Sequence, residues 1–163
     1  MEALPHLPVG ALVLDLAAGT GRHARAIAAT GRPVIALDFV ESAVRRAVRG
    51  SPLVAGLVAD ATALPLSPGT LPAIVCVNFL DRALFPRLIG LLELGGFLVY
   101  ETYTVEHRSL DATRGPRNPD YMLRPGELNT LVAPLTILAY REGLERDDAG
   151  ERHVASVVAR KDA

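Results

Sequence analysis

Apolar runs alternate with amphipathic segments along most of the chain. Short runs that end at a polar residue or a turn predict buried strands, and apolar residues spaced three and four apart predict helices. The predicted strands are residues 11–14, 33–38, 52–59, 71–77, 97–103, 135–140 and 153–159. The predicted helices begin near residue 22, cover 41–50 and 83–94, and begin again near residue 124. This alternation predicts an α/β fold with a mostly parallel sheet.

A strand, a glycine turn and a helix follow one another between residues 13 and 24. Asp15 ends the apolar run, Gly19 and Gly21 form the turn, and Ala24 begins the helical pattern. Glycine lets the backbone approach a ligand closely, and the unpaired N–H groups of a first helical turn attract ligand oxygens. The Asp15 carboxylate repels a pyrophosphate and attracts a ligand that carries an ammonium and a sulfonium. The alternative is a glycine turn that only packs a helix on the sheet.

A second acid, Asp38, ends the next predicted strand. It lies 19 residues beyond Gly19, a spacing that suits a carboxylate bound to a ribose diol at the sheet edge. Because NAD enzymes share this spacing, it indicates a nucleoside without selecting the class of enzyme. Phe39 is placed to pack against the adenine or the ribose. The alternative role of Asp38 is to cap the following helix.

Polar residues also follow the predicted strands 71–77 and 97–103. The candidate site residues there are Asn78, Phe79, Asp81, Arg82, Glu101, Thr102 and Tyr103. Open α/β sheets bind ligands at the carboxyl ends of their strands, so these side chains are expected on the ligand side. For Asp81 and Arg82, helix capping and a surface ion pair are the alternative. A buried Glu101 needs a partner such as an arginine, or a shifted pKa.

Residues 104–124 show no clear periodicity, and we refer to them as the arm. A loop of this length inside a domain is usually functional or disordered, and we predict a lid or substrate arm. Arg114, Arg117 and Asn118 are candidates to bind an anion or the cofactor, and Tyr121 is a candidate to close the pocket. A merely mobile loop is the alternative.

Length and composition predict a single domain over residues 1–163. Half of the 163 residues are hydrophobic, the formal net charge is −1, and Cys76 is the one cysteine. We expect no disulfide, no signal peptide and no membrane span, and therefore a cytoplasmic protein. Neither a Cys/His cluster with metal-ligand spacing nor a Gly-x-Ser-x-Gly motif is present, so no metal is expected. Arg45, Arg46 and Arg49 are interpreted as a solvated helix face rather than a nucleic-acid patch.

The string Asp-Leu-Ala-Ala-Gly-Thr-Gly, residues 15–21, resembles the first motif of class I S-adenosylmethionine-dependent methyltransferases. Asp38, Asp60-Ala61 and Leu94-Gly-Gly-Phe97 extend the resemblance. Segments around Asn78–Pro86, Tyr100–Thr102 and Asn118–Leu128 are similar to small bacterial methyltransferases of the tellurite-resistance type. The family implies a Rossmann-like, doubly wound, mostly parallel seven-stranded sheet that ends in an antiparallel hairpin, with the last strand beside the fifth. The hairpin connection is expected over residues 141–152.

The resemblance also implies a cofactor, a reaction and a set of residues. The cofactor is S-adenosyl-L-methionine, whose methyl group an acceptor attacks in line, leaving S-adenosyl-L-homocysteine. The implied cofactor-binding residues are Asp15, Ala17, Gly19, Thr20, Gly21, Asp38, Phe39, Asp60, Ala61, Asn78 and Phe79. The candidate substrate-binding residues are Asp81, Arg82, Tyr103, Arg117 and Tyr121. The catalytic candidates are Asn78, Glu101 and Tyr103, with His23 as a further candidate base.

The expected acceptor is a small molecule, and no membrane partner is expected. A non-catalytic cofactor-binding subunit is one alternative, because residues 1–9 leave no room for the helices that cover the substrate in many methyltransferases. A nicotinamide-dependent oxidoreductase is another, although Asp15 disfavours it. The arginines keep RNA methylation open, and a homodimer is also left open.

Overall fold

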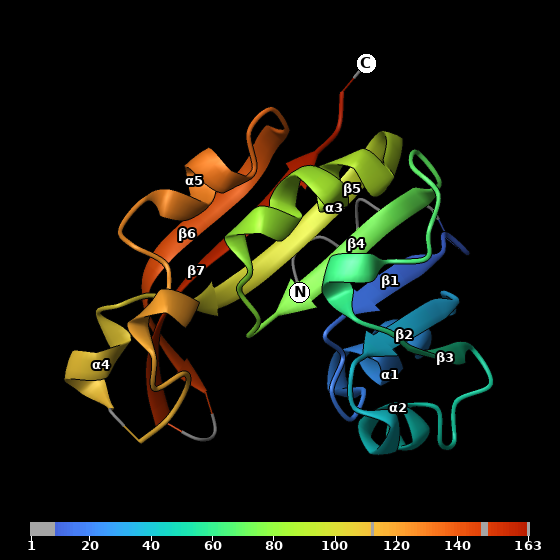
Figure 1. Ribbon diagram of the computed structural model, residues 1–163, viewed down its shortest axis with the longest axis horizontal. Coiled ribbons are helices and arrows are strands. Elements are labelled where there is room, and N and C mark those ends of the chain that lie inside the picture. The colour runs from blue at the N-terminus through green and yellow to red at the C-terminus, as the bar shows by residue number, and fades with distance from the viewer. Residues whose placement is uncertain (1–8, 112, 148–149, 163) are drawn as a thin grey trace.

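A computed structural model describes residues 9–111, 113–147 and 150–162, so the short segment before residue 9 lies outside the described residues. The chain forms one seven-stranded sheet with the order β3-β2-β1-β4-β5-β7-β6 (Figure 1). The strands are β1 (Val13–Leu16), β2 (Val34–Asp38), β3 (Val54–Val58), β4 (Leu71–Val77), β5 (Leu92–Tyr103), β6 (Thr136–Asp147) and β7 (Gly150–Arg160). Strands β1 to β5 pair in parallel, and β7 lies antiparallel between β5 and β6. The predicted fold class is confirmed.

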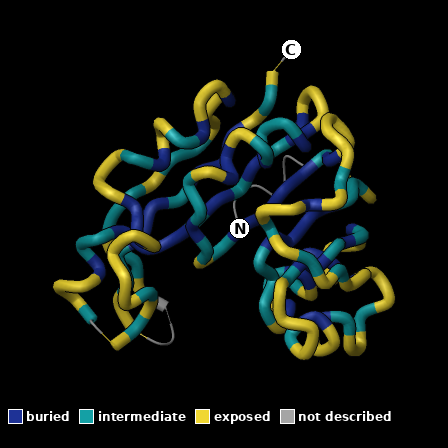
Figure 2. The backbone as a smooth tube through the Cα atoms, viewed as in Figure 1, coloured by how far each residue is buried: buried dark blue, intermediate teal, exposed yellow. Residues whose placement is uncertain are grey.

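Short helices cover both faces of this sheet. They are α1 (Arg22–Ala28), α2 (Glu41–Ala47), α3 (Phe85–Leu91), α4 (His107–Leu110) and α5 (Glu127–Leu131), with 3-10 turns η2 (Ala61–Ala63), η3 (Arg82–Leu84) and η4 (Pro119–Tyr121). Successive β1 residues point to opposite faces, so Val13 packs with α1 and α2 whereas Leu14 packs with α3 and α5. Figure 2 shows the buried residues concentrated along the strands and the exposed ones on the surrounding loops.

The predicted helix over 83–94 is wrong at its carboxyl end. Helix α3 ends at Leu91, and β5 already begins at Leu92 and pairs there with Leu71 of β4. The run of leucines fits helical spacing, but strand pairing overrides it. A Cβ on Gly96 would lie 2.9 Å from the backbone oxygens of Glu93 and Leu71, so this close backbone approach requires glycine. The Gly95–Gly96 pair therefore sits inside a strand rather than at a helix end.

The predicted hairpin connection over 141–152 is also wrong, because the strands continue through it. Paired residues run from Arg141 opposite Ser156 to Asp147 opposite Gly150. Most residues between 140 and 153 are polar. Oppositely charged side chains face one another across the two paired strands, such as Glu145 and Arg152. Asp148, which falls within the predicted connection, lies outside the described residues.

The arm is a folded segment rather than a featureless loop. It contains α4 and η4, and Thr104 forms an isolated bridge with Leu123. Met122 and Leu123 are buried. Within the described residues, no helix has the length and apolar character that crossing a membrane requires.

Candidate active site

The glycine loop after β1 is a tight turn in left-handed conformations. Ala17, Gly19 and Gly21 have φ angles of 54°, 54° and 80°, and the Ala18 N–H donates to the Leu37 carbonyl at 2.9 Å. A Cβ on Gly21 would lie 2.5 Å from the Cβ of Ala47, so Gly21 serves the packing of α1 against α2. A Cβ on Gly19 would meet nothing within 4 Å. Gly21 therefore has a packing role, whereas the space beside Gly19 is open.

Asp15 is a buried acid directly before this loop. Its side chain is 1 % exposed, and its Oδ2 atom has no hydrogen-bond partner. Burial raises the pKa of Asp15 from 3.8 to about 7, the Ala24 backbone N–H opposes this shift, and the nearby Asp38 charge adds to it. An unpaired buried carboxylate is costly and is stabilised by a cation. The sequence-based expectation that Asp15 attracts a positively charged ligand fits this geometry.

Asp38 joins the end of β2 to the glycine loop. Its Oδ2 accepts from the Gly19 N–H at 2.7 Å, and its Oδ1 accepts from the Val40 N–H at 2.9 Å. Each carboxylate oxygen has a second lone pair, so both remain available to a diol. The neighbouring Phe39 is 75 % exposed. An exposed aromatic ring beside the carboxylate is suited to pack against a nucleoside.

Asp60 and Ala61 lie at the same edge, after β3. The Asp60 Oδ1 accepts from both the backbone N–H and the hydroxyl of Thr62, each at 2.8 Å, and caps η2. These bonds lower the pKa of Asp60. The exposed carboxylate is therefore an ionised acceptor, which suits the cofactor-binding role that the resemblance implies for Asp60.

The end of β4 also has a strained backbone. Asn78 has a φ of 60°, and its N–H donates to the Glu101 carbonyl of β5 at 2.8 Å. The Tyr100 hydroxyl donates to the Phe79 carbonyl at 2.6 Å. A non-glycine residue in the left-handed region is uncommon and clusters at functional sites. Ala17, directly after the adjacent strand β1, shares this feature, so the two residues lie at the same edge of the sheet.

The catalytic candidates on β5 are occupied by other contacts. Glu101 forms a 2.7 Å ion pair with Arg152, which also contacts Glu145 at 2.9 Å. Of the two alternatives predicted for Glu101, an arginine partner or a shifted pKa, the structure shows the arginine partner. Tyr103 is buried, with its ring 4.6 Å from that of His107 between centroids. Arg152 and Glu145 were missed because the hairpin connection was expected there, and no local motif marks them.

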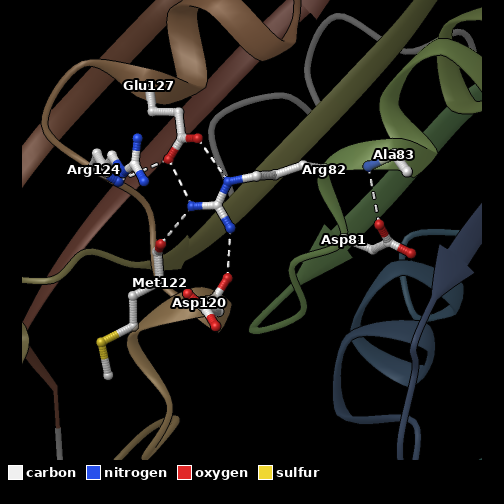
Figure 3. Close-up of polar contacts among 7 residues, drawn as sticks. All are labelled: Asp81, Arg82, Ala83, Asp120, Met122, Arg124 and Glu127. Atoms are coloured by element: carbon white, nitrogen blue, oxygen red, sulfur yellow. Dashed lines mark hydrogen bonds and ion pairs between the residues drawn. The ribbon is translucent and has the colours of Figure 1, made fainter.

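The predicted substrate residues divide into two groups. The Asp81 carboxylate accepts from the Ala83 N–H at 2.9 Å and caps η3, while Arg82 pairs with Glu127 at 2.7 Å (Figure 3). These contacts match the alternative of helix capping and an ion pair. Arg117 and Tyr121, by contrast, are exposed on the arm. The cofactor candidates thus lie at the carboxyl edge of β1 to β4, whereas Arg82 contacts Glu127.

Burial shifts the pKa values of two further titratable residues, His23 and Cys76. Burial, followed by the Arg22 charge, lowers the pKa of His23. Cys76 is buried, as predicted, and burial raises its pKa. In the described ranges, no group of three or more His, Cys, Asp or Glu residues is arranged to hold a metal ion.

A basic hollow lies beside the glycine loop. It is lined by Thr20, Arg25, Arg46 and Arg49. The Arg25 guanidinium donates to the Thr20 carbonyl at 2.7 Å. Arg46 and Arg49 are exposed, which agrees with a solvated helix face and also leaves their charge available to an anion.

Comparison with known proteins identifies the family. Residues 13–96 match the model of the methyltransferase domain family. The demethylmenaquinone methyltransferase of Beutenbergia cavernae is 36 % identical over 110 residues, covering 64 % of this chain and 45 % of that protein. A putative 23S rRNA (guanine-N(1)-)-methyltransferase of Micromonospora griseorubida is 37 % identical over 99 residues, covering 59 % and 33 %. The chain thus spans less than half the length of these relatives.

Solved structures agree on the fold. A SAM-dependent methyltransferase of Methanosarcina mazei superimposes with a TM-score of 0.79 at 17 % identity, covering 97 % of this chain and 95 % of that one. TehB of Haemophilus influenzae gives a TM-score of 0.72 at 18 % identity, covering 93 % and 57 %. The chain belongs to the methyltransferase domain family, which confirms the predicted family. Family and neighbours support S-adenosylmethionine as the cofactor.

Proposed function

We propose that this member of the methyltransferase family binds S-adenosylmethionine at the carboxyl edge of β1 to β4 and transfers its methyl group to a small-molecule acceptor. The buried Asp15 carboxylate carries this proposal, because its Oδ2 has no partner beside a loop with open space above Gly19. A cofactor with a sulfonium and an ammonium supplies the missing positive charge. The bound cofactor would supply an activated methyl group.

The cofactor-binding residues take separate roles along the edge. Asp38 is placed to accept from the ribose hydroxyls, and Phe39 to cover the nucleoside. Asp60 and the Ala61 N–H would contact the adenine. Asn78 and Phe79, at the end of β4, would border the transferred methyl group, so the proposed acceptor site begins there.

The acceptor is proposed to be nucleophilic without help from a strong general base. Glu101 is paired with Arg152, and Tyr103 is buried with its ring against that of His107, which supports the proposal that neither acts as the base. The protein's contribution is then alignment and exclusion of water. The demethylmenaquinone methyltransferase relatives favour a small quinol-like acceptor. We further propose that the protein is cytoplasmic and that residues 1–163 form one domain. In this domain the arm would contact the substrate.

Methylation of RNA is the second candidate. It is favoured by the basic hollow of Thr20, Arg25, Arg46 and Arg49 next to the cofactor loop and by the rRNA methyltransferase relative. Filter binding of tRNA and rRNA fragments at increasing salt distinguishes the candidates, because contacts to phosphates weaken steeply with salt. A screen with tritiated S-adenosylmethionine over demethylmenaquinone, thiols, small acids and tRNA identifies the acceptor.

Asp38→Ala is expected to weaken binding of S-adenosylhomocysteine at least tenfold, or about 1.4 kcal/mol. The substitution removes the proposed acceptor of the ribose hydroxyls and the bond that fixes the Gly19 N–H. Isothermal titration calorimetry measures the dissociation constant. Asp111→Ala is the matched control, because its carboxylate also accepts a backbone N–H two residues on, at 2.8 Å, but lies on the arm. Equal affinities for the two variants would contradict the proposed role.

A further inference from the structure

Arg82 connects the end of β4 to a distant part of the chain. Its Nε donates to Glu127 Oε1 at 2.7 Å, and its Nη2 donates to Glu127 Oε2 and to the Met122 carbonyl, each at 2.8 Å. Its Nη1 donates to the Asp120 carbonyl. All three guanidinium nitrogens therefore contact residues 120–127, as Figure 3 shows. We call these contacts the Arg82 clamp.

Glu127 is itself held in place for this contact. Its Oε2 also accepts from the Arg124 N–H at 2.8 Å, so the carboxylate ties the start of α5 to the end of the arm. The Glu127 side chain is 19 % exposed, against 36 % for Arg82. A two-pronged arginine–carboxylate pair in a partly buried position is directional and stronger than an exposed ion pair.

The other end of the arm has a separate anchor. His107 is buried, its Nε2 lies 3.1 Å from the Arg114 carbonyl, and its Nδ1 accepts from the His153 N–H at 3.3 Å. The Leu123 N–H donates to the Tyr103 carbonyl at 2.9 Å, which joins the two ends of the arm. Within the segment held by the Arg82 clamp, Tyr121 is 58 % exposed. The arm is therefore fixed at both ends while its aromatic residue is left open to contact a ligand.

We propose that Arg82 is a positioning residue that holds the arm beside the end of β4, so that Tyr121 forms a preformed wall of the acceptor site. This inference rests on the proposed function only in taking the end of β4 as the transfer site. Arg82 follows Asn78 by four residues, and the two carbonyls that it binds flank Tyr121 directly. Arg82 acts on the acceptor through the arm and makes no contact with it.

A single-tryptophan reporter tests the clamp, because the chain contains no tryptophan. In a Tyr121→Trp background, the anisotropy and acrylamide quenching of the indole report how firmly the arm is held. Arg82→Ala is expected to raise the quenching constant about twofold or more, and Arg82→Lys to give an intermediate value, because a lysine cannot make the two-pronged contact. Titration of each variant with S-adenosylhomocysteine is expected to give unchanged affinity.

Arg87→Ala is the matched control. Arg87 also holds a loop through backbone carbonyls, those of Leu64 at 3.2 Å and Leu66 at 2.7 Å, and these two partners lie outside the arm. If Arg82→Ala does not fold, Glu127→Gln replaces it, with an intermediate rise expected. Indole signals equal to those of Arg87→Ala would overturn the inference. Failure of the wild-type chain to bind S-adenosylhomocysteine would overturn the proposed function and leave the indole result interpretable.

Discussion

Asp15→Asn is expected to raise the free energy of unfolding at pH 8 by up to about 4 kcal/mol. This value follows because the pKa of Asp15 is 3.8 in the unfolded chain and about 7 in the folded protein. The unfolded Asp15 loses its proton near pH 3.8, whereas the folded one keeps it up to about pH 7. The unfolded state therefore binds fewer protons between these values, and the stability of the wild-type protein falls as the pH rises through this window. The neutral amide escapes this loss, so the gain should vanish near pH 4. Urea denaturation across the pH range measures it.

The same substitution is expected to weaken S-adenosylmethionine binding at least tenfold, or about 1.4 kcal/mol. A buried carboxylate that destabilises the free protein is compensated when a cation binds beside it. Binding should also release protons near pH 7, because the cationic ligand lowers the pKa of Asp15. Titrations in buffers of different ionisation enthalpy detect this release. A variant that is less stable at pH 8, or that binds the cofactor unchanged, would refute this role.

Gly21→Ala is expected to destabilise the protein by roughly 2–5 kcal/mol, the sum of left-handed strain and overpacking. The new Cβ would lie 2.5 Å from the Cβ of Ala47, at a φ of 80°. Gly19→Ala is the matched comparison, since its φ is also positive but its Cβ would meet nothing within 4 Å. We expect Gly19→Ala to cost only the strain and to weaken S-adenosylhomocysteine binding instead. Denaturation midpoints measure the stability of both variants, and calorimetry measures their affinity for S-adenosylhomocysteine. Equal losses of stability would contradict the assignment of the packing role to Gly21 alone.

The sequence was sufficient to predict the order of strands and helices through the first four strands. Hydrophobic periodicity and strand-end acids are local signals, so the placement of Asp15 and Asp38 at one edge of the sheet follows from the sequence alone. The error at Leu92 arose where a leucine-rich run fitted helical spacing while pairing with Leu71 decided otherwise. The local hydrophobic pattern does not show that Leu92 pairs with Leu71, because the two residues lie far apart in the sequence.

The contacts of the candidate site residues were harder to predict than their positions. Arg82 was a natural candidate for substrate binding, but its partner Glu127 lies 45 residues away. The ion pair between Glu101 and Arg152 likewise depends on β7 lying beside β5. Such pairings are set by the sheet topology. A single sequence therefore shows the chemistry of each side chain but not which residue it contacts.

Calorimetric titration of the wild-type chain with S-adenosylmethionine, compared with NADH, tests the central claim most directly. We expect one cofactor molecule to bind per chain, with loss of affinity in both Asp15→Asn and Asp38→Ala, and no comparable binding of NADH. No binding of S-adenosylmethionine, or an affinity that neither substitution changes, would contradict the assignment of these acids to the cofactor site.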